Sequence, residues 1–166
     1  ALAGEASREG SWVAIVGMPQ VGLVAAARRG IDLARLALVP HPGAQAATAA
    51  AACVDGMDLV VLGSGLALSD ADRRRLGARA RERGSVLLVA GQADAKAWPG
   101  TRVEFVVEYS RWSGLGAGDG RLRDRDMVIA VRERGGPARR VTLRLDGEVS
   151  MWRPGVRDAV LTEEVA

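Results

Sequence analysis

The chain has 166 residues, of which 48% are hydrophobic, and a formal net charge of +3. This length suits one domain, and the hydrophobic content allows a packed core and excludes wholesale disorder. A single cysteine and a single histidine exclude an internal disulfide, a cysteine-rich zinc site and a site of several histidines.

The first ninety residues alternate between strand and helix signals. Short apolar runs predict buried strands, and alanine-rich or arginine-rich runs that end at glycine predict helices. In chain order we expect strands at 12–16, 36–39, 59–62 and 86–89, with helices at 23–29, 44–54 and 69–84 between them. Asp72 follows Ser69 by three residues, which is a capping signal for the last helix. This order predicts a mainly parallel sheet covered by helices.

The pattern changes after Gly91. Apolar and polar residues alternate over 103–109, 127–131 and 141–145, which predicts strands, and the glycines at 135 and 136 predict a hairpin between the last two. The tail from Pro154 fits either a weak amphipathic helix or a disordered segment. We therefore expect an α/β protein with one core domain over 1–150, a C-terminal antiparallel β extension within it, and a tail over 151–166.

Several common sites are excluded or disfavoured. The only lysine, Lys96, is followed by Ala97, so the chain contains no P-loop. His41 stands between two prolines and is interpreted as a surface-loop histidine rather than a catalytic one. No apolar run approaches the length of a membrane span and no signal peptide is recognised, so we expect a cytoplasmic protein without membrane contact.

The glycine-rich stretch from Gly114 to Gly120 superficially resembles a phosphate-binding loop. A dinucleotide fingerprint starting at Gly114 would need glycine where Asp119 stands, and the stretch lies between β segments and does not open a helix. We therefore interpret it as a flexible connection, with a binding loop as the less favoured alternative.

Arginines form two dense groups. The first lies on the helix expected at 69–84, and the second alternates along a predicted strand: Arg73, Arg74, Arg75, Arg79, Arg81 and Arg83, then Arg121, Arg123 and Arg125. A solvated outer face is the favoured interpretation of both groups, and a face for DNA or an acidic partner is the alternative. The leading candidates for such a face are Arg73, Arg74, Arg75, Arg79, Arg121 and Arg123. The balance of 23 basic against 20 acidic residues does not by itself favour DNA binding.

Four tryptophans dominate the aromatic residues. Trp12, at a strand start, is expected in the core, and Trp98 is expected to pack a loop onto the domain. Trp152 is a candidate interface anchor, because exposed tryptophans often serve that role. Cys53 is expected to be a buried, small apolar residue.

Several strings resemble the RecA-fold core, entered after its P-loop helix. The strand ending at Val16, the stretch 30–43, and "AACVDGMDLVVLGSGLAL" at 51–68, which is similar to the Walker B strand with its approach, carry the resemblance. The fold would place an Mg²⁺-holding aspartate at position 63 and a water-activating glutamate within 17–20, but this chain has Gly63 and Gly17-Met-Pro-Gln20 there. The resemblance thus implies a RecA-like fold whose nucleotide site is emptied, with no catalysis, cofactor or metal.

Together with "RWSGLGAGDGRLR" at 111–123, these features resemble the actinobacterial ImuA-prime family, RecA-like accessory proteins of the translesion mutasome. The resemblance implies a scaffold in damage-induced mutagenesis that binds ImuB, a Y-family polymerase relative, and through it an error-prone polymerase and the sliding clamp. It further implies that the C-terminal part holds ImuB, here through Trp152, Val156, Val160 and Leu161. The alternatives are a DNA-binding RecA-like regulator and a RecA-like cell-division inhibitor of the SOS response, and self-association stays open.

Overall fold

The structure is a computed structural model that describes residues 2–91, 97–115 and 120–146. The chain divides into two compact units, Ala1–Gly100 (unit 1) and Thr101–Ala166 (unit 2). The division follows closely on the change of sequence pattern at Gly91, whereas we expected one core domain over 1–150. That domain assignment stays a prediction.

Unit 1 alternates strands and helices in the order predicted. Its elements are α1 (Leu2–Arg8), β1 (Val13–Val16), α2 (Leu23–Arg28), η1 (Leu33–Arg35), β2 (Leu36–Val39), η2 (Gly43–Gln45), α3 (Ala46–Gly56), β3 (Leu59–Leu62), α4 (Asp70–Arg83) and β4 (Val86–Val89). The four strands are parallel and lie in the order β2-β1-β3-β4. The predicted α/β class with a parallel sheet flanked by helices is therefore confirmed.

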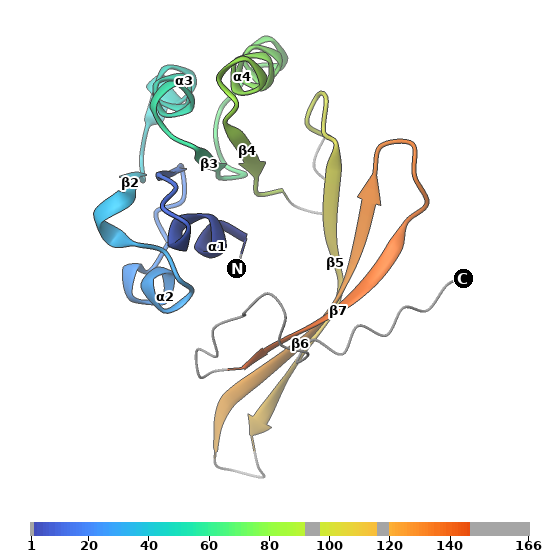
Figure 1. Ribbon diagram of the computed structural model, residues 1–166. Helices are drawn as coiled ribbons and strands as arrows, with labels where there is room; N and C mark the ends of the chain where they lie inside the picture. Colours follow the sequence, from blue (N-terminus) through green and yellow to red (C-terminus); the bar gives the residue numbers. More distant parts are fainter. Residues whose placement is uncertain (1, 92–96, 116–119, 147–166) are drawn as a thin grey trace. The chain divides into compact units, whose positions relative to one another are not determined.

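The helices cover both faces of this sheet. After β2 the chain crosses to the far side of β1, and right-handed crossovers then place the connecting helices on opposite faces. In Figure 1, α1 and α2 lie on one face, and α3 and α4 lie on the other. The turns that follow the strands are thereby gathered at one edge of the sheet, with a topological switch point between β1 and β3.

Alternating strand residues divide the core between the two faces. Val16 and Leu62 are completely buried on the face covered by α3 and α4, where Val54 and Leu76 pack against them. Ile15 points to the other face and packs with the α1 side of the unit. Alanine side chains along α3 allow this helix to approach the strands closely.

The predicted cap of α4 is present. The Ser69 hydroxyl accepts a hydrogen bond from the Asp72 amide at 3.1 Å, and the Asp72 carboxylate accepts one from the Ser69 amide at 3.1 Å. Hydrogen bonding to Ser69 lowers the pKa of Asp72 from its usual value. Gly84 ends the helix with a φ of 72°, a left-handed conformation that favours glycine.

Two predictions about burial are wrong. Trp12 is 47% exposed, because the buried strand begins only at Val13. The Trp12 amide donates to the Asp58 carboxylate at 2.7 Å, and this hydrogen bond holds the backbone at the start of β1. The second error is β4, expected to be buried, in which Val86 is 51% exposed because β4 is the edge strand.

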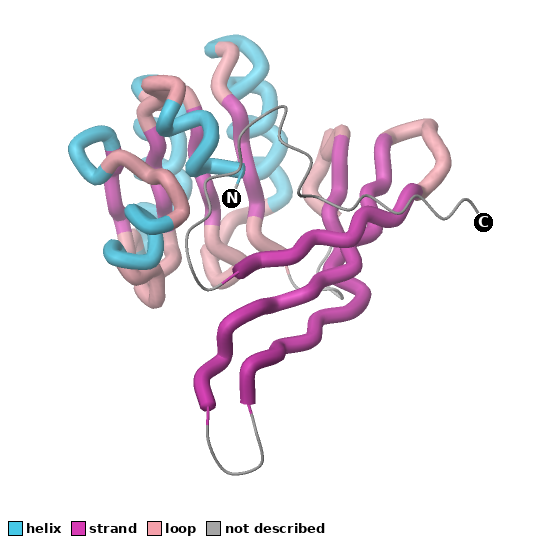
Figure 2. Tube along the Cα trace, turned by 60° about the horizontal axis from the view of Figure 1, so that its bottom comes forward, coloured by secondary structure: helices cyan, strands magenta, loops and turns pink. Residues whose placement is uncertain are grey.

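Unit 2 contains a three-stranded antiparallel sheet, drawn in magenta in Figure 2. Its strands are β5 (Val103–Leu115), β6 (Gly120–Glu133) and β7 (Arg139–Asp146), in that order. They extend well beyond the predicted ranges, and the hairpin predicted at Gly135 joins β6 to β7. Within the described ranges, no helix is both long and apolar enough to cross a membrane.

Candidate functional site

The turns after the parallel strands surround a hollow of about 650 Å³. Ligands of open α/β sheets bind in this position, outside the carboxyl ends of the strands. The residues around the hollow come from the turns after all four strands: Gly17 to Gln20, Pro40 to Gly43, Gly63 to Ala67, and Ala90. It is therefore the first place to look for a bound ligand.

The chemistry of this hollow is neutral. Three prolines, Met18 and Leu66 supply apolar surface, and the polar side chains are those of Gln20, His41 and Ser64. No aspartate, glutamate, lysine or arginine is among the described residues around it. His41 is exposed, as predicted for a loop histidine. The described residues of the hollow thus supply neither a basic clamp for phosphate nor a carboxylate for Mg²⁺.

The backbone explains why no carboxylate stands at the end of β3. A Cβ atom added to Gly63 would lie 2.2 Å from the carbonyl oxygen of Gly17 and 2.9 Å from Cγ of Met18. The Gly63 amide donates to the Val16 carbonyl at 2.8 Å, which holds the ends of β1 and β3 together. Position 63 therefore accepts only glycine.

Gly17 is constrained in the same way. Its φ of 72° is left-handed, and an added Cβ would lie 2.3 Å from Cδ2 of Leu66. Leu66 also packs against the main core cluster. A leucine side chain and two close backbone turns thus occupy the space beside the switch point. Elsewhere in the part of the chain that is described, no three His, Cys, Asp or Glu side chains are grouped to hold a metal ion.

Three arginines of α4, Arg75, Arg79 and Arg83, lie along a groove of about 870 Å³ between α3 and α4. The Asp55 carboxylate, at the end of α3, accepts two hydrogen bonds from Arg79 at 2.6 Å and lies 3.3 Å from Arg83. Leu76 and Ala80, on the same helix, pack into the core. The groove also contains Asp72 and Glu82, so three carboxylates face the three arginines Arg75, Arg79 and Arg83.

Arg73 occupies a different setting. Its guanidinium carbon lies 5.7 Å from the centre of the Trp98 ring, and its Nε is buried without a hydrogen-bond partner. Trp98 itself packs against the main core cluster, which confirms the prediction that it packs a loop onto the domain. Arg74 and Arg81 remain exposed on the outer side of α4. Three of the six α4 arginines, Arg73, Arg79 and Arg83, are therefore engaged within unit 1.

We expect Asp55 to make the stability of unit 1 sensitive to acid. Hydrogen bonds from Arg79 lower the pKa of Asp55 from its usual 3.8. Its contribution is therefore present above that value and is lost as the pH falls through the lower pKa of the folded state. Asp55→Asn should flatten the loss of stability below about pH 4, measured by urea unfolding at several pH values. Glu82→Gln, in the same groove, is the matched control, and an equal change in both variants would contradict the assignment.

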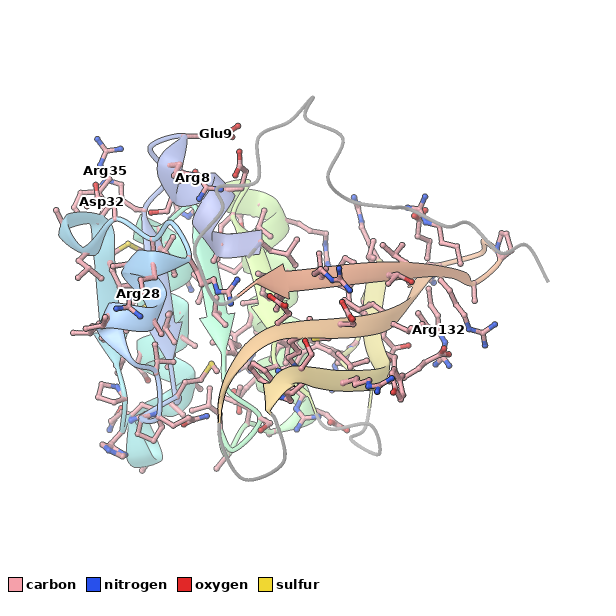
Figure 3. The ribbon with its side chains drawn as sticks, turned by 90° about the horizontal axis from the view of Figure 1, so that it is seen from below. Arg8, Glu9, Arg28, Asp32, Arg35 and Arg132 are labelled. Carbon is pink, nitrogen blue, oxygen red and sulfur yellow. The ribbon has the colours of Figure 1, made fainter. Side chains whose placement is uncertain are left out.

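Three further arginines of unit 1 were not singled out from the sequence. Arg8, Arg28 and Arg35 lie on the surface of α1, α2 and η1, together with Glu9 and Asp32 (Figure 3). The Arg35 guanidinium donates to the Gly10 carbonyl at 2.5 Å, and Arg8 pairs with Glu5. Acidic residues lie among these arginines, so this surface carries little net charge.

The remaining candidates lie wholly or partly outside the described residues. Arg121 and Arg123 belong to β6 by their backbone, but their side chains are not described. The tail candidates Trp152, Val156, Val160 and Leu161 lie outside the described ranges. Cys53 is partly buried against the main core cluster, and this burial raises the pKa of its thiol.

Comparison with known proteins identifies the family of unit 1. A family model described as the MT3502 N-terminal domain matches residues 1–100, which are the residues of unit 1. The chain belongs to the MT3502 N-terminal domain family. The neutral hollow, the Gly63–Gly17 approach and the α3–α4 groove all lie within the matched domain.

The chain is also similar to a mycobacterial protein. The chain is 51% identical over 81 residues to the uncharacterized protein Rv3395c of Mycobacterium tuberculosis strain ATCC 25618 / H37Rv. The match covers 48% of this chain and 40% of the relative, so the chain spans less than half of that protein's length.

Proposed function

We propose that this chain is a non-catalytic, RecA-like accessory protein that binds ImuB and supports damage-induced translesion synthesis. Its role is that of a scaffold, which reaches an error-prone polymerase and the sliding clamp through ImuB. The observation that carries the proposal is the 2.2 Å approach at Gly63, the position where the resembled fold has its Mg²⁺-binding aspartate.

Two further features support the non-catalytic part. The residues described around the strand-end hollow include no carboxylate for a metal or an attacking water and no lysine or arginine for phosphate. Leu66 packs against Gly17 beside the switch point, where a nucleotide would bind. A parallel α/β domain with these features is suited to protein contacts rather than to phosphoryl transfer.

Equilibrium binding of ATP with Mg²⁺ tests the proposal that the chain has no functional nucleotide site. We expect no binding at micromolar nucleotide, because the described residues of the hollow include none of the charges that hold triphosphate and metal. A RecA protein measured in parallel shows that the assay detects binding. Micromolar affinity, or ATP turnover that is lost when His41 or Gln20 is replaced by alanine, would contradict the proposal.

Co-purification with ImuB tests the partner. We expect the full chain to retain ImuB, and Val156→Asp with Val160→Asp to lose it, because the resemblance places the contact in the tail. Arg157→Ala, which keeps the apolar residues, is the matched control. Capture of the division GTPase without ImuB would support a cell-division inhibitor instead.

DNA binding is the competing use of the arginines. Asp55 pairs with Arg79 and Arg83, and Arg73 stacks on Trp98, so three of the six α4 arginines have partners within unit 1. We expect only weak DNA affinity by fluorescence anisotropy. An affinity that falls steeply between 50 and 200 mM salt, and that Arg74→Glu with Arg81→Glu abolishes, would establish the DNA-binding regulator.

A further inference from the structure

Arg75 and Glu82 are charged residues of α4 whose side chains are exposed and border the α3–α4 groove. Among the described residues, neither forms an ion pair or a side-chain hydrogen bond, in contrast to Arg79, which pairs with Asp55. Asp72 acts on Arg75, and Arg79 on Glu82, only through longer-range electrostatics. Both charges are therefore available to a partner.

The two charges lie on one narrow stripe of α4. Successive residues turn by about 100° around a helix, so positions 75, 78 and 82 fall within about 60° of one another. Ala78, between the two charges, is exposed and also borders the groove. The α4 stripe thus carries a positive charge, a small side chain and a negative charge, with about 10 Å along the helix between the charged residues.

We propose that the α4 stripe binds the same stripe of a second copy of the chain, with the two helices antiparallel. A two-fold axis then passes beside Ala78, and Arg75 of each copy faces Glu82 of the partner subunit. One contact forms two ion pairs, because a two-fold interface repeats every pair. Parallel helices would instead place like charges side by side, so electrostatics selects the antiparallel orientation.

The surroundings of the stripe have room for a second helix. The axes of packed helices approach more closely where the side chains at the contact are small, as Ala78 is. On α3, Thr48 and Ala52 border the same groove and are also small and exposed. Arg79 lies next to the proposed axis, but the Asp55 carboxylate accepts two hydrogen bonds from it at 2.6 Å. Its charge is thereby compensated in each copy, so the arginines at the axis do not oppose the contact.

The association is expected to be weak. Exposed ion pairs contribute little free energy and the stripe is short, so we expect a dissociation constant on the order of 100 µM. Unfolding measured at low micromolar concentration therefore reports the single chain. Because the stripe lies within unit 1, this contact goes beyond the proposed binding of ImuB and does not depend on it.

Sedimentation equilibrium of the purified full chain, without ImuB, tests the association. We expect the average mass to rise from monomer toward dimer between about 10 µM and 1 mM. Arg75→Glu and Glu82→Arg should each weaken association by about tenfold, because two attractive pairs become two repulsive pairs. An equimolar mixture of these two variants should restore it, since opposite charges then face each other at both places. Arg74→Glu, which makes the same change of charge off the stripe, should have no effect.

Cross-linking tests the orientation of the two helices. In a Cys53→Ser background, a short bismaleimide should join Ala78→Cys between copies, because position 78 lies beside the axis. Ala71→Cys, an exposed position one turn before Arg75, should not be joined. Antiparallel helices separate the two copies of position 71 by about 22 Å along the axis. Cross-linking at both positions would indicate parallel helices and would overturn the proposal.

The remaining outcomes are equally decisive. A chain that stays monomeric up to about 1 mM would contradict the association. Association that neither charge reversal weakens would place the contact on another surface, and a mixture that fails to restore it would contradict the pairing of Arg75 with Glu82. Arg75→Gln and Glu82→Gln, which remove the attraction without adding repulsion, should weaken association less and serve where a charge-reversed chain fails to fold.

Discussion

Gly63→Asp is expected to destabilise unit 1 by about 3 kcal/mol or more, a cost typical of severe overpacking. The new Cβ would lie 2.2 Å from the Gly17 carbonyl oxygen, so the ends of β1 and β3 must separate. Their separation would also lengthen the 2.8 Å hydrogen bond from the Gly63 amide to Val16. Urea unfolding followed by far-UV circular dichroism measures this loss.

Gly65→Asp is the matched control for this variant. An added Cβ at Gly65 meets no atom within 4 Å, so the same substitution two residues later should cost little. A Gly63→Asp chain that is as stable as Gly65→Asp would contradict the close approach. A stable variant that also gained Mg²⁺ binding would weaken the proposal that the nucleotide site is closed by the backbone.

Leu62→Ala is expected to destabilise unit 1 by about 2–5 kcal/mol, the range for a buried leucine that leaves a cavity. Leu62 is completely inaccessible and packs in the cluster between the sheet, α3 and α4. Hydrogen exchange of the β1 and β3 amides should report the same loss as urea unfolding, because both strands contribute to that cluster.

Leu38→Ala provides the comparison for this cavity. Leu38 is 39% exposed on the edge strand β2, so its truncation should cost about 1 kcal/mol or less. Similar losses in the two variants would show that the cluster around Leu62 is not the main stabilising contact of unit 1.

Local features of unit 1 could be predicted because short stretches of sequence carry them. Four apolar residues between glycines and prolines indicate a buried strand, and Ser69 with Asp72 indicates the start of α4. The same reasoning was wrong for Val86, because the sequence of an apolar strand does not show whether the strand lies at the centre or at the edge of the sheet. The prediction for Trp12 was wrong for a related reason: this residue lies one position before the start of β1, where its side chain is no longer covered.

The candidate site depended on contacts between distant residues. Arg79 and Asp55 are 24 residues apart, and no spacing rule pairs them, so the partners of the α4 arginines could not be assigned from the sequence. The two faces of the β5–β7 sheet likewise required the register, including the bulge between Val107 and Tyr109 that reverses the alternation.

By itself, the sequence determined the alternation of strands and helices, the cap of α4 and the absence of a P-loop lysine, because each depends on neighbouring residues. Only the tertiary structure explains why position 63 requires glycine. A Cβ atom there would collide with the carbonyl oxygen of Gly17, which is 46 residues earlier in the chain. The tertiary structure also decided which arginines are free, because charge partners come from other elements. Strand order and close backbone approach depend on residues that are distant in the sequence, so a local sequence pattern cannot predict them.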